Sequence, residues 1–533
     1  MWTSTLDLSI GHILPTKILG RFWRGAYFSS LAPLQVRNLP RQPLTNGMGN
    51  WVRVHNRLAG ICGSDLHLVF ADGDLSIAPA ALPAHSHSYP GHEVVGEVIE
   101  IGENVQHLRV GDRVVLQSGP NCLSAGVQNP CNACATGNYN LCSNGKLPGP
   151  GQIGGGWSEE MLLHEQQLFR VSDDIEDDQA VLLEPTAVAL HAVLRRPPQA
   201  GEKVLIVGAG TIGLLTAQVV HALAPQAEMS VMARHMFQAE KAMSMGAAHI
   251  LDGHNNYESV EKLTGSKLYT GMMGNKMLLG GYDVIYDTVG TSSTIHDSLR
   301  WVRAHGTVVL VGVNLHQMKL DLSPIWHQEV NLIGAMGHGM EYWPLGSEQQ
   351  RSTFAIASDL ILHGVLHPEK LITHRYGLDN FRDALRDAAD KKESRALKVV
   401  FDATLLGVSS APNALPAAHP LFPFRKTEDD LVSHAEDWQA QLTPAGQNAP
   451  STGPSHFTMA QSEDFTADFD HIQFVSPKVR RPPTPLEFHQ SADDAPTAPR
   501  PIRPVAATNV RQQTLESVEE VADDSMQTPQ GEV

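Results

Sequence analysis

The chain has 533 residues, more than one domain usually holds, which suggests two or three domains. Its 42% hydrophobic and 18% charged residues are typical of a soluble globular protein. The formal net charge of -18 argues against nucleic-acid binding, because neutralising phosphates requires clustered Lys and Arg. The N-terminus lacks the features of a secretory leader, and glycines and polar residues interrupt the apolar stretch 204–224. We therefore expect a cytoplasmic protein without membrane spans.

Three of the five cysteines lie close together, at Cys131, Cys134 and Cys142. Five cysteines in so long a chain do not make a disulfide scaffold. The spacing favours metal binding instead, and it fits a reducing compartment.

The first part of the chain predicts a small β-barrel. We expect residues 1–50 to be irregular, with scattered Pro and Gly, and residues 51–58 to form a half-buried strand because polar and apolar side chains alternate. Short strands punctuated by glycine follow within residues 90–116, and residues 119–156 are typical of a loop.

The period changes near residue 177. Residues 180–195 predict a helix with acids before it and arginines at its end. Residues 203–207 predict a buried strand that enters Gly208-x-Gly210-x-x-Gly213 and then a helix. Further strands are expected at 229–233, 249–251, 282–287 and 307–313, with helices at 237–245, 351–363 and 378–390 and a last strand at 397–401. Alternating strands and helices predict a doubly wound parallel sheet.

Residues 405–533 differ in composition from the rest of the chain. They are rich in Pro, Ser, Thr, Gln and acidic residues, with few periodic apolar runs. Such a segment cannot bury enough surface to offset its ordering entropy, so we expect it to be mostly disordered. The alternative is that short apolar patches, such as Phe474 with Val475, are docking motifs.

The stretch 61–67 places a thiol, a hydroxyl, a carboxylate and an imidazole within a few residues, which indicates half of a metal site. Together with Pro-Gly-His-Glu at 90–93, Gly-Asp-Arg-Val at 111–114, Leu-Glu-Pro at 183–185 and the glycine motif, it resembles the zinc-dependent medium-chain dehydrogenases. Within them, it is most similar to the polyol, threonine and sugar dehydrogenase branch. The resemblance covers residues of about 30 to 404. It implies an α/β protein with a GroES-like β-barrel catalytic domain (1–199 and 337–404), a Rossmann cofactor domain (200–336) and the tail.

The resemblance also implies the ligands of a catalytic zinc. Cys62 and His92 would bind the metal, while Glu93 and Glu184 would each either bind it or hold its water. A catalytic zinc takes three protein ligands and keeps one position open, where it acts as a Lewis acid on an alcohol oxygen. The alternative for Cys62 or His92 alone is an ordinary core residue.

Three neighbours of Cys62 would support the reaction. Asp65 suits an acceptor that orients His92. Ser64 suits the hydroxyl that contacts the substrate oxygen, and His67 suits the outer end of a proton relay.

The structural zinc lobe departs from the family pattern C-x2-C-x2-C-x7-C. Cys131, Cys134 and Cys142 match its last three positions, but Gln128 stands at the first, and Gln is a poor zinc ligand beside thiolates. Cys122 lies six residues upstream and could complete the site. The alternative is a lobe without metal.

The cofactor motif admits a pyrophosphate through Gly208, Gly210, Thr211, Ile212 and Gly213. The family fingerprint expects an acid about 20 residues later to hold the adenosine ribose. This chain has Ala-Arg-His at 233–235 instead. Arg234 offers a planar donor group for a 2′-phosphate, which favours NADP over NAD. The alternative is a solvent-exposed Arg at a strand end.

These features predict a zinc-dependent alcohol or polyol dehydrogenase that exchanges hydride between a CH–OH or carbonyl substrate and NAD(P). Two alternatives are a zinc-free quinone or enoyl reductase, which would lack Cys62 and His92, and a non-catalytic cofactor-binding sensor that uses its tail. The family suggests a homodimer or homotetramer, and neither nucleic acid nor membrane is expected as a partner.

Overall fold

The computed structural model describes residues 1–45, 47–82, 87–145, 152–407 and 413–414. The predicted disordered tail therefore lies almost wholly outside the described residues. Within the part of the chain that is described, no helix is long and apolar enough to cross a membrane.

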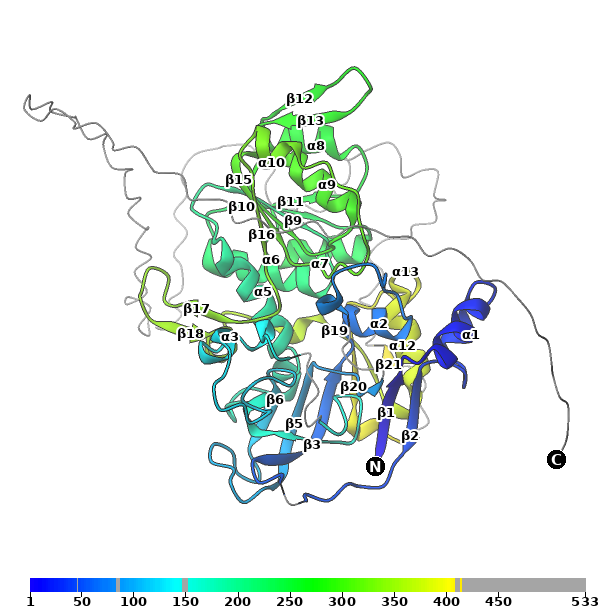
Figure 1. The fold of residues 1–533 in the computed structure, drawn as a ribbon. Helices are drawn as coiled ribbons and strands as arrows, with labels where there is room; N and C mark the ends of the chain where they lie inside the picture. Colours follow the sequence, from blue (N-terminus) through cyan, green and yellow to red (C-terminus); the bar gives the residue numbers. More distant parts are fainter. Residues whose placement is uncertain (46, 83–86, 146–151, 408–412, 415–533) are drawn as a thin grey trace, which may run out of the picture. The chain divides into compact units, whose positions relative to one another are not determined.

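The catalytic domain is built on an eight-stranded sheet whose strands come from both ends of the described chain (Figure 1). The strand over residues 51–60 pairs antiparallel with the strand over residues 398–402 on one side and with the strand over residues 94–101 on the other. In sheet order the strands are β21 (Asn413–Ala414), β19 (Ile372–Tyr376), β20 (Lys398–Asp402), β3 (Trp51–Gly60), β5 (Val94–Ile101), β6 (Arg113–Leu116) and β8 (Leu168–Arg170), and β7 (Glu160–His164) also pairs with β3. The strand predicted from alternation at 51–58 and the glycine-punctuated strands predicted within 90–116 are confirmed as β3, β5 and β6.

The cofactor domain contains a six-stranded sheet whose neighbouring strands all pair in parallel. Both faces of such a sheet are covered by helices, which explains why the strands read as continuous apolar runs. In sheet order the strands are β11 (His249–Leu251), β10 (Glu228–Met232), β9 (Lys203–Val207), β14 (Tyr282–Asp287), β15 (Val302–Leu310) and β16 (Asn331–Gly334). The helices are α6 (Thr211–Leu223), α7 (Met236–Ser244), α8 (Asn256–Thr264), α9 (Ser292–Trp301) and α10 (Ser323–His327).

The expectation that residues 1–50 are irregular is wrong. β1 (Trp2–Asp7) pairs with β2 (Leu34–Asn38) and β4 (His87–Ser88), and α1 (Ile10–Gly20) and the 3-10 turn η1 (Arg24–Phe28) lie between β1 and β2. The strand β1 was hard to recognise because two of its fully buried residues, Thr3 and Ser4, are polar and consecutive, so both faces of the strand are covered there. Polar residues at buried positions hide the alternation on which a strand prediction rests.

The predicted helix over 180–195 is divided in two. It forms α4 (Asp177–Ala180) and α5 (Leu183–Arg195). Pro185 explains the break, since its ring would clash with the carbonyl of residue 181 in a continuous helix and it has no N–H to donate.

The remaining elements are short or lie near the C-terminal end of the described chain. Two hairpins, over 267–279 and 340–352, were not expected from the sequence. The elements are α2 (Gly63–Val69), η2 (Pro79–Ala81), α3 (Asn132–Ala135), η3 (Tyr139–Leu141), η4 (Glu165–Gln167), β12 (Lys267–Thr270), β13 (Lys276–Leu279), β17 (Met340–Tyr342), β18 (Gln350–Ser352), α11 (Thr353–Leu362), η5 (Pro368–Leu371), η6 (Leu378–Asn380), α12 (Phe381–Ala389), α13 (Lys391–Ser394) and η7 (Ala403–Leu405).

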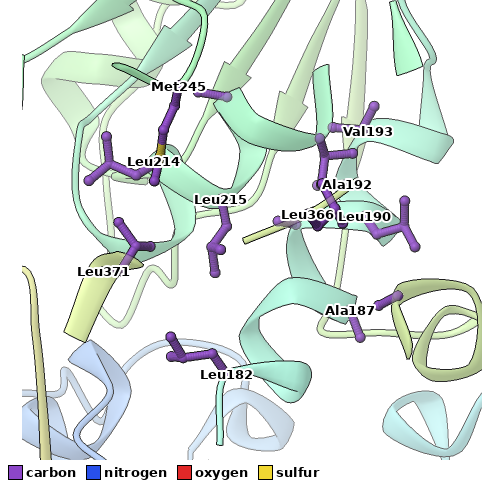
Figure 2. Packing of buried hydrophobic residues seen from close by; sticks show 14 of the residues in the cluster. Leu182, Ala187, Leu190, Ala192, Val193, Leu214, Leu215, Met245, Leu366 and Leu371 are labelled. Atoms are coloured by element: carbon purple, nitrogen blue, oxygen red, sulfur yellow. The ribbon is translucent and has the colours of Figure 1, made fainter. Parts of the chain in front are cut away.

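One apolar core joins the catalytic helix α5 to the cofactor-domain helix α6 (Figure 2). Leu190 and Val193 of α5 and Leu214 and Leu215 of α6 are fully buried in it. Each such side chain contributes about 1.5–3 kcal/mol on burial. The core therefore fixes α5, whose first turn carries Glu184.

Candidate active site

Cys62 leaves β3 and begins the short helix α2, where it occupies the position before the first helical residue. Its backbone N–H donates to Oδ2 of Asp65 at 3.1 Å, so the carboxylate caps the helix that follows. Ser64 lies in the first turn of α2 and His67 in its second. The local fold thus holds the predicted thiol, hydroxyl and imidazole at one end of a buried strand.

His92 and Glu93 follow a tight turn at Gly91. Gly91 has a φ of +89°, and a Cβ atom there would lie 2.4 Å from the indole of Trp157, so only glycine fits. Nδ1 of His92 lies 3.4 Å from Oδ1 of Asp65. The predicted partnership of Asp65 with His92 is therefore present in the geometry.

The ligand atoms of Cys62, His92 and Glu93 all lie within 4.8 Å of one another. Burial of the His92 ring opposes its protonation, but Asp65 and Cys62 outweigh burial and raise the pKa of His92 well above its usual value. A site that favours positive charge and offers sulfur, nitrogen and oxygen donors suits a catalytic zinc. The residues present therefore fit the metal that the sequence predicts.

Glu93 has a partner that the sequence did not reveal. Nζ of Lys398, in strand β20, lies 2.5 Å from Oε2 of Glu93, and both side chains are buried. The same ammonium donates to the carbonyl of Ile61 at 3.2 Å. Gly60 permits this approach, because a Cβ atom there would lie 2.0 Å from Oε2 of Glu93. The only signal for Lys398 was a charged residue inside a short apolar strand.

Glu184 lies in the first turn of α5, close enough to interact electrostatically with the other site residues. Burial raises the pKa of Glu184 to about 7, with Glu93 and Asp65 adding to the increase while His92 and Lys398 oppose it. Unlike Glu93, it is not one of the three residues whose ligand atoms converge. The two glutamates thus differ, because Glu93 is paired with Lys398, whereas Glu184 interacts with the site through electrostatics.

His67, the predicted outer end of a proton relay, lies beside a contact with the cofactor domain. Its Nδ1 lies 3.2 Å from Oδ2 of Asp72, and Oδ1 of Asp72 lies 3.2 Å from Nε2 of His316. The backbone N–H of Asp74 donates to the carbonyl of Leu315 at 2.8 Å. The loop after α2 and the loop after β15 are therefore joined beside the outer end of the predicted relay.

Four cysteines form a second group. The Sγ atoms of Cys122, Cys131, Cys134 and Cys142 all lie within 4.8 Å of one another. Hydrogen bonds from the backbone N–H groups of Cys134 and Ser143 lower the pKa of Cys131 to about 6, which favours the thiolate that zinc requires. Burial raises the pKa of Cys134.

The fourth position of this lobe is filled from upstream. Cys122 is buried, its Sγ lies 3.6 Å from that of Cys142, and it accepts from the backbone N–H of Cys131 at 3.4 Å. Gln128, at the family's first position, is exposed. The grouping agrees with the expectation that Cys122 completes a tetrahedral set of thiolates, a donor set that suits structural zinc.

The glycine motif has the geometry that a dinucleotide requires. Gly208 has a φ of +99°, and a Cβ atom on Gly213 would lie 1.9 Å from the carbonyl oxygen of Gly208, so the helix packs close to the strand. Gly210 precedes α6 without a side chain to cap it. Thr211 and Ile212 form the first turn, so their backbone N–H groups lie at the helix end that binds phosphates.

Basic residues gather where β10 ends. Arg234 is exposed there, and the ring of His235 stacks on Phe237 at 5.7 Å with the Arg395 guanidinium 5.8 Å from Phe237. Burial lowers the pKa of His235, and Arg234 and the lysines of α13 lower it further. Both domains therefore contribute positive charge to this edge of the sheet.

Two family models match the chain. The alcohol dehydrogenase GroES-like domain matches residues 48–173, and the zinc-binding dehydrogenase domain matches residues 211–349. The chain belongs to the zinc-binding medium-chain alcohol dehydrogenase family, as the sequence motifs predicted. The predicted class of enzyme, an oxidoreductase acting on alcohols or polyols, is that of this family.

Named relatives lie in the polyol branch. Sorbitol dehydrogenase of Arabidopsis thaliana is 28% identical over 66% of this chain and 88% of the relative, and L-idonate 5-dehydrogenase of Vitis vinifera is 29% identical over 69% and 93%. Among solved structures, 2R,3R-butanediol dehydrogenase of Bacillus subtilis is 26% identical, with a TM-score of 0.54 over 69% of this chain and 96% of that one.

Proposed function

We propose that the chain oxidises a secondary hydroxyl group of a polyol, or reduces the matching carbonyl, by hydride exchange with NADP. The observation that supports this most is the convergence of Cys62, His92 and Glu93 beside Ser64 and His67, in a chain that also has a dinucleotide turn. A hydroxyl and an imidazole beside a set of metal-binding side chains favour proton transfer at that site over cofactor binding alone.

Cys62 and His92 would hold the catalytic zinc, with Glu93 or Glu184 as the oxygen ligand. Bound there, zinc supplies a Lewis acid that favours loss of the substrate's hydroxyl proton. Glu93 converges with Cys62 and His92, but its carboxylate is also paired with Lys398, so Glu184 remains the second candidate for the oxygen ligand.

The protein's own groups would move the proton. The Ser64 hydroxyl would accept it from the substrate oxygen and pass it to His67, which is half-buried and reaches solvent. Asp65 would keep the His92 ring in one orientation. Asp72 would do the same for His67, since it is within ion-pair distance of Nδ1.

The preference for NADP rests on charge at the end of β10. An acid at this position would repel a 2′-phosphate, whereas Arg234 offers it a planar pair of donors. Lys391, Lys392 and Arg395 of the catalytic domain add positive charge nearby. NAD carries no phosphate there, so it would gain nothing from this group.

The substrate class rests on the relatives. Sorbitol, arabinitol and butanediol, named in several of them, all carry more than one hydroxyl group. We therefore propose a polyhydroxy substrate rather than a simple alcohol. The homodimeric or homotetrameric state and the cytoplasmic location stay predictions.

Metal analysis of the purified chain, combined with reduction of NADP⁺ and NAD⁺ across a panel of polyols and monohydric alcohols, tests the proposal. We expect stoichiometric zinc and turnover with polyols, faster with NADP⁺. Stoichiometric zinc without turnover on any alcohol would favour the alternative of a non-catalytic cofactor-binding protein. As a matched pair, Ser64→Ala should abolish turnover while Ser76→Ala, in an exposed loop, should not.

A further inference from the structure

The helix α1 presents an exposed apolar face, defined by Ile10, Leu14, Ile18, Phe22 and Trp23. The exposed fractions of Ile10 and Phe22 are 80% and 87%, and that of Trp23 is 61%. A spacing of four residues keeps Ile10, Leu14, Ile18 and Phe22 on one side of the helix and its continuation. Contiguous apolar surface of this kind marks a site of interaction.

The opposite side of α1 is held against the protein through a polar residue. Thr16 is buried, and its hydroxyl donates to the carbonyl of Leu31 at 2.9 Å. A Cβ atom on Gly20 would lie 2.4 Å from the ring of Tyr27, which packs edge-on against Phe70 at 5.2 Å. The helix thus buries a threonine and exposes its large apolar side chains, the reverse of an ordinary surface helix.

The charge around this face points to an acidic partner. The chain has a formal net charge of -18, yet no Asp or Glu occurs between Leu8 and Ser64. Lys17 and Arg21 are exposed on α1 beside the apolar face. A partner segment should therefore combine apolar residues at helical spacing with acids.

One segment of this chain meets that description. Residues 428–442 contain Glu428, Asp429, Asp430, Glu436 and Asp437, and they contain no Lys or Arg. Four of the segment's apolar residues are spaced by four, three and four positions, a pattern that would place them on one face if the segment were helical. They are Leu431, Ala435, Trp438 and Leu442. We propose that residues 428–442 dock on the apolar face of α1.

The residues between 414 and 428 start close enough to α1, and are numerous enough, for residues 428–442 to reach its apolar face. The described chain ends at Ala414 in β21, which pairs with β19, and α12 packs against β19. From α12, Nε of Arg382 donates to the carbonyl of Phe28 at 2.6 Å, in the 3-10 turn that packs on α1. Packed elements lie about 10 Å apart, and the residues between 414 and 428 can span about 46 Å. A tethered segment acts at an effective concentration in the millimolar range.

Two other occupants fit less well. A second copy of this chain would bring Lys17 and Arg21 of one face against the same residues of the other. Electrostatic binding to an anionic membrane uses clusters of about four to eight Lys and Arg residues. These two occupants become outcomes of the test.

Hydrogen–deuterium exchange of the full-length protein tests the proposal. Replacing both Leu431→Ser and Trp438→Ser should make the amides of α1 exchange about tenfold faster, because a docked segment protects them. The control is Leu486→Ser with Phe488→Ser, which removes an apolar patch elsewhere in the tail and should change nothing. About 0.5 M salt should also weaken the protection, because it screens the charges.

Equal exchange rates in α1 for the wild type and the first variant would overturn the proposal, as would an equal effect of the control. Protection that depends on protein concentration would assign the face to a second copy, and protection only with anionic vesicles would assign it to a membrane. A reciprocal pair, Leu14→Ser with Ile18→Ser, should make residues 428–442 more sensitive to protease in a folded protein. Unchanged sensitivity would count against docking.

Discussion

The ammonium of Lys398 lies 2.5 Å from the carboxylate of Glu93, and 2% and 1% of these side chains are exposed. Breaking such a pair by removing one partner leaves a buried charge without compensation, which typically costs about 3–5 kcal/mol. The pair also ties β20, from the C-terminal part of the catalytic domain, to the turn that carries His92. A structural link and a candidate zinc ligand thus share one carboxylate.

Lys398→Met should therefore lower the free energy of unfolding by about 3 kcal/mol or more. The measurement is urea unfolding followed by circular dichroism. Lys319→Met, at an exposed position, is the control and should change stability by less than about 0.5 kcal/mol. Adding Glu93→Gln to Lys398→Met should restore part of the loss, because the double variant buries no unpaired charge. Equal losses for the two single Lys variants would show that the pair contributes nothing.

Asp65→Asn should weaken zinc binding at the catalytic site by about 10- to 100-fold, since groups that orient a metal-bound His have effects of this size. Competition with a chromophoric chelator measures the affinity. Asp72→Asn changes a carboxylate that contacts His67 rather than His92, so its zinc affinity should match the wild type. If both variants lost zinc equally, orientation of His92 by Asp65 would not be the cause.

The sequence predicted those parts of the fold in which the hydrophobic pattern of a strand and the residues of the following turn indicate the same structure. β9 is fully apolar after its first residue, and its glycine turn leaves few conformations open. The stretch 61–67 was singled out because its residue types are rare at such spacing, whereas His92, Glu93 and Glu184 were named as candidate ligands from the family resemblance. Their roles as ligands still rest on the family resemblance and the proposal above.

Lys398 and the N-terminal strands were missed for a common reason. Thr3, Ser4 and Lys398 are polar residues at buried positions that are normally apolar. The strand that holds Thr3 and Ser4 pairs with β2, and Lys398 pairs with Glu93, in both cases across a long stretch of chain. Glu93 is hundreds of residues from Lys398, and no local pattern connects them. A buried polar residue can be interpreted only once its partner is known.

Arg234→Ala should weaken NADP⁺ binding by about tenfold or more. A hydrogen bond to a charged group contributes about 1.5–3 kcal/mol, and its loss would lower the affinity by this factor. Binding of NAD⁺ should change by less than about twofold, because NAD⁺ lacks the 2′-phosphate. Titration calorimetry with both cofactors gives the two affinities. Arg195→Ala, at the exposed end of α5, is the control for general loss of positive charge. A parallel loss for both cofactors would contradict the assignment of Arg234.

Cys122→Ser should reduce the metal content from about two zinc ions to about one per chain, since a structural site uses four ligands. Plasma mass spectrometry gives the metal content, and a thermal scan should show a lower unfolding temperature. Gln128→Ala is the informative control, because the family pattern places a ligand there, whereas the exposed Gln128 lies outside the thiol group. Loss of zinc in Gln128→Ala but not in Cys122→Ser would reverse the assignment.

His338 should make the stability of the protein depend on pH. Burial lowers the pKa of His338 to about 4, and His191 and His92 lower it further against a hydrogen bond to the backbone of Gln117. In the unfolded chain a His titrates near pH 6.5. Between about pH 4 and pH 6.5 the unfolded state therefore binds a proton at His338 that the folded state does not bind. Stability should therefore be full above about pH 6.5 and fall by roughly 3 kcal/mol as the pH drops to about 4.

His338→Asn keeps a donor but removes the titrating ring, so it should flatten the pH dependence in this window. The measurement is the urea unfolding free energy at several values between about pH 4 and pH 7. His254→Asn, at an exposed position, is the matched control and should leave the slope unchanged. The edge contact of His338 with Phe354, at 4.7 Å between ring centres, will also be lost, which lowers stability equally at every pH. The slope of the unfolding free energy against pH therefore reports the protonation of His338 separately from its packing. An unchanged slope in His338→Asn would refute His338 as the source of the pH dependence.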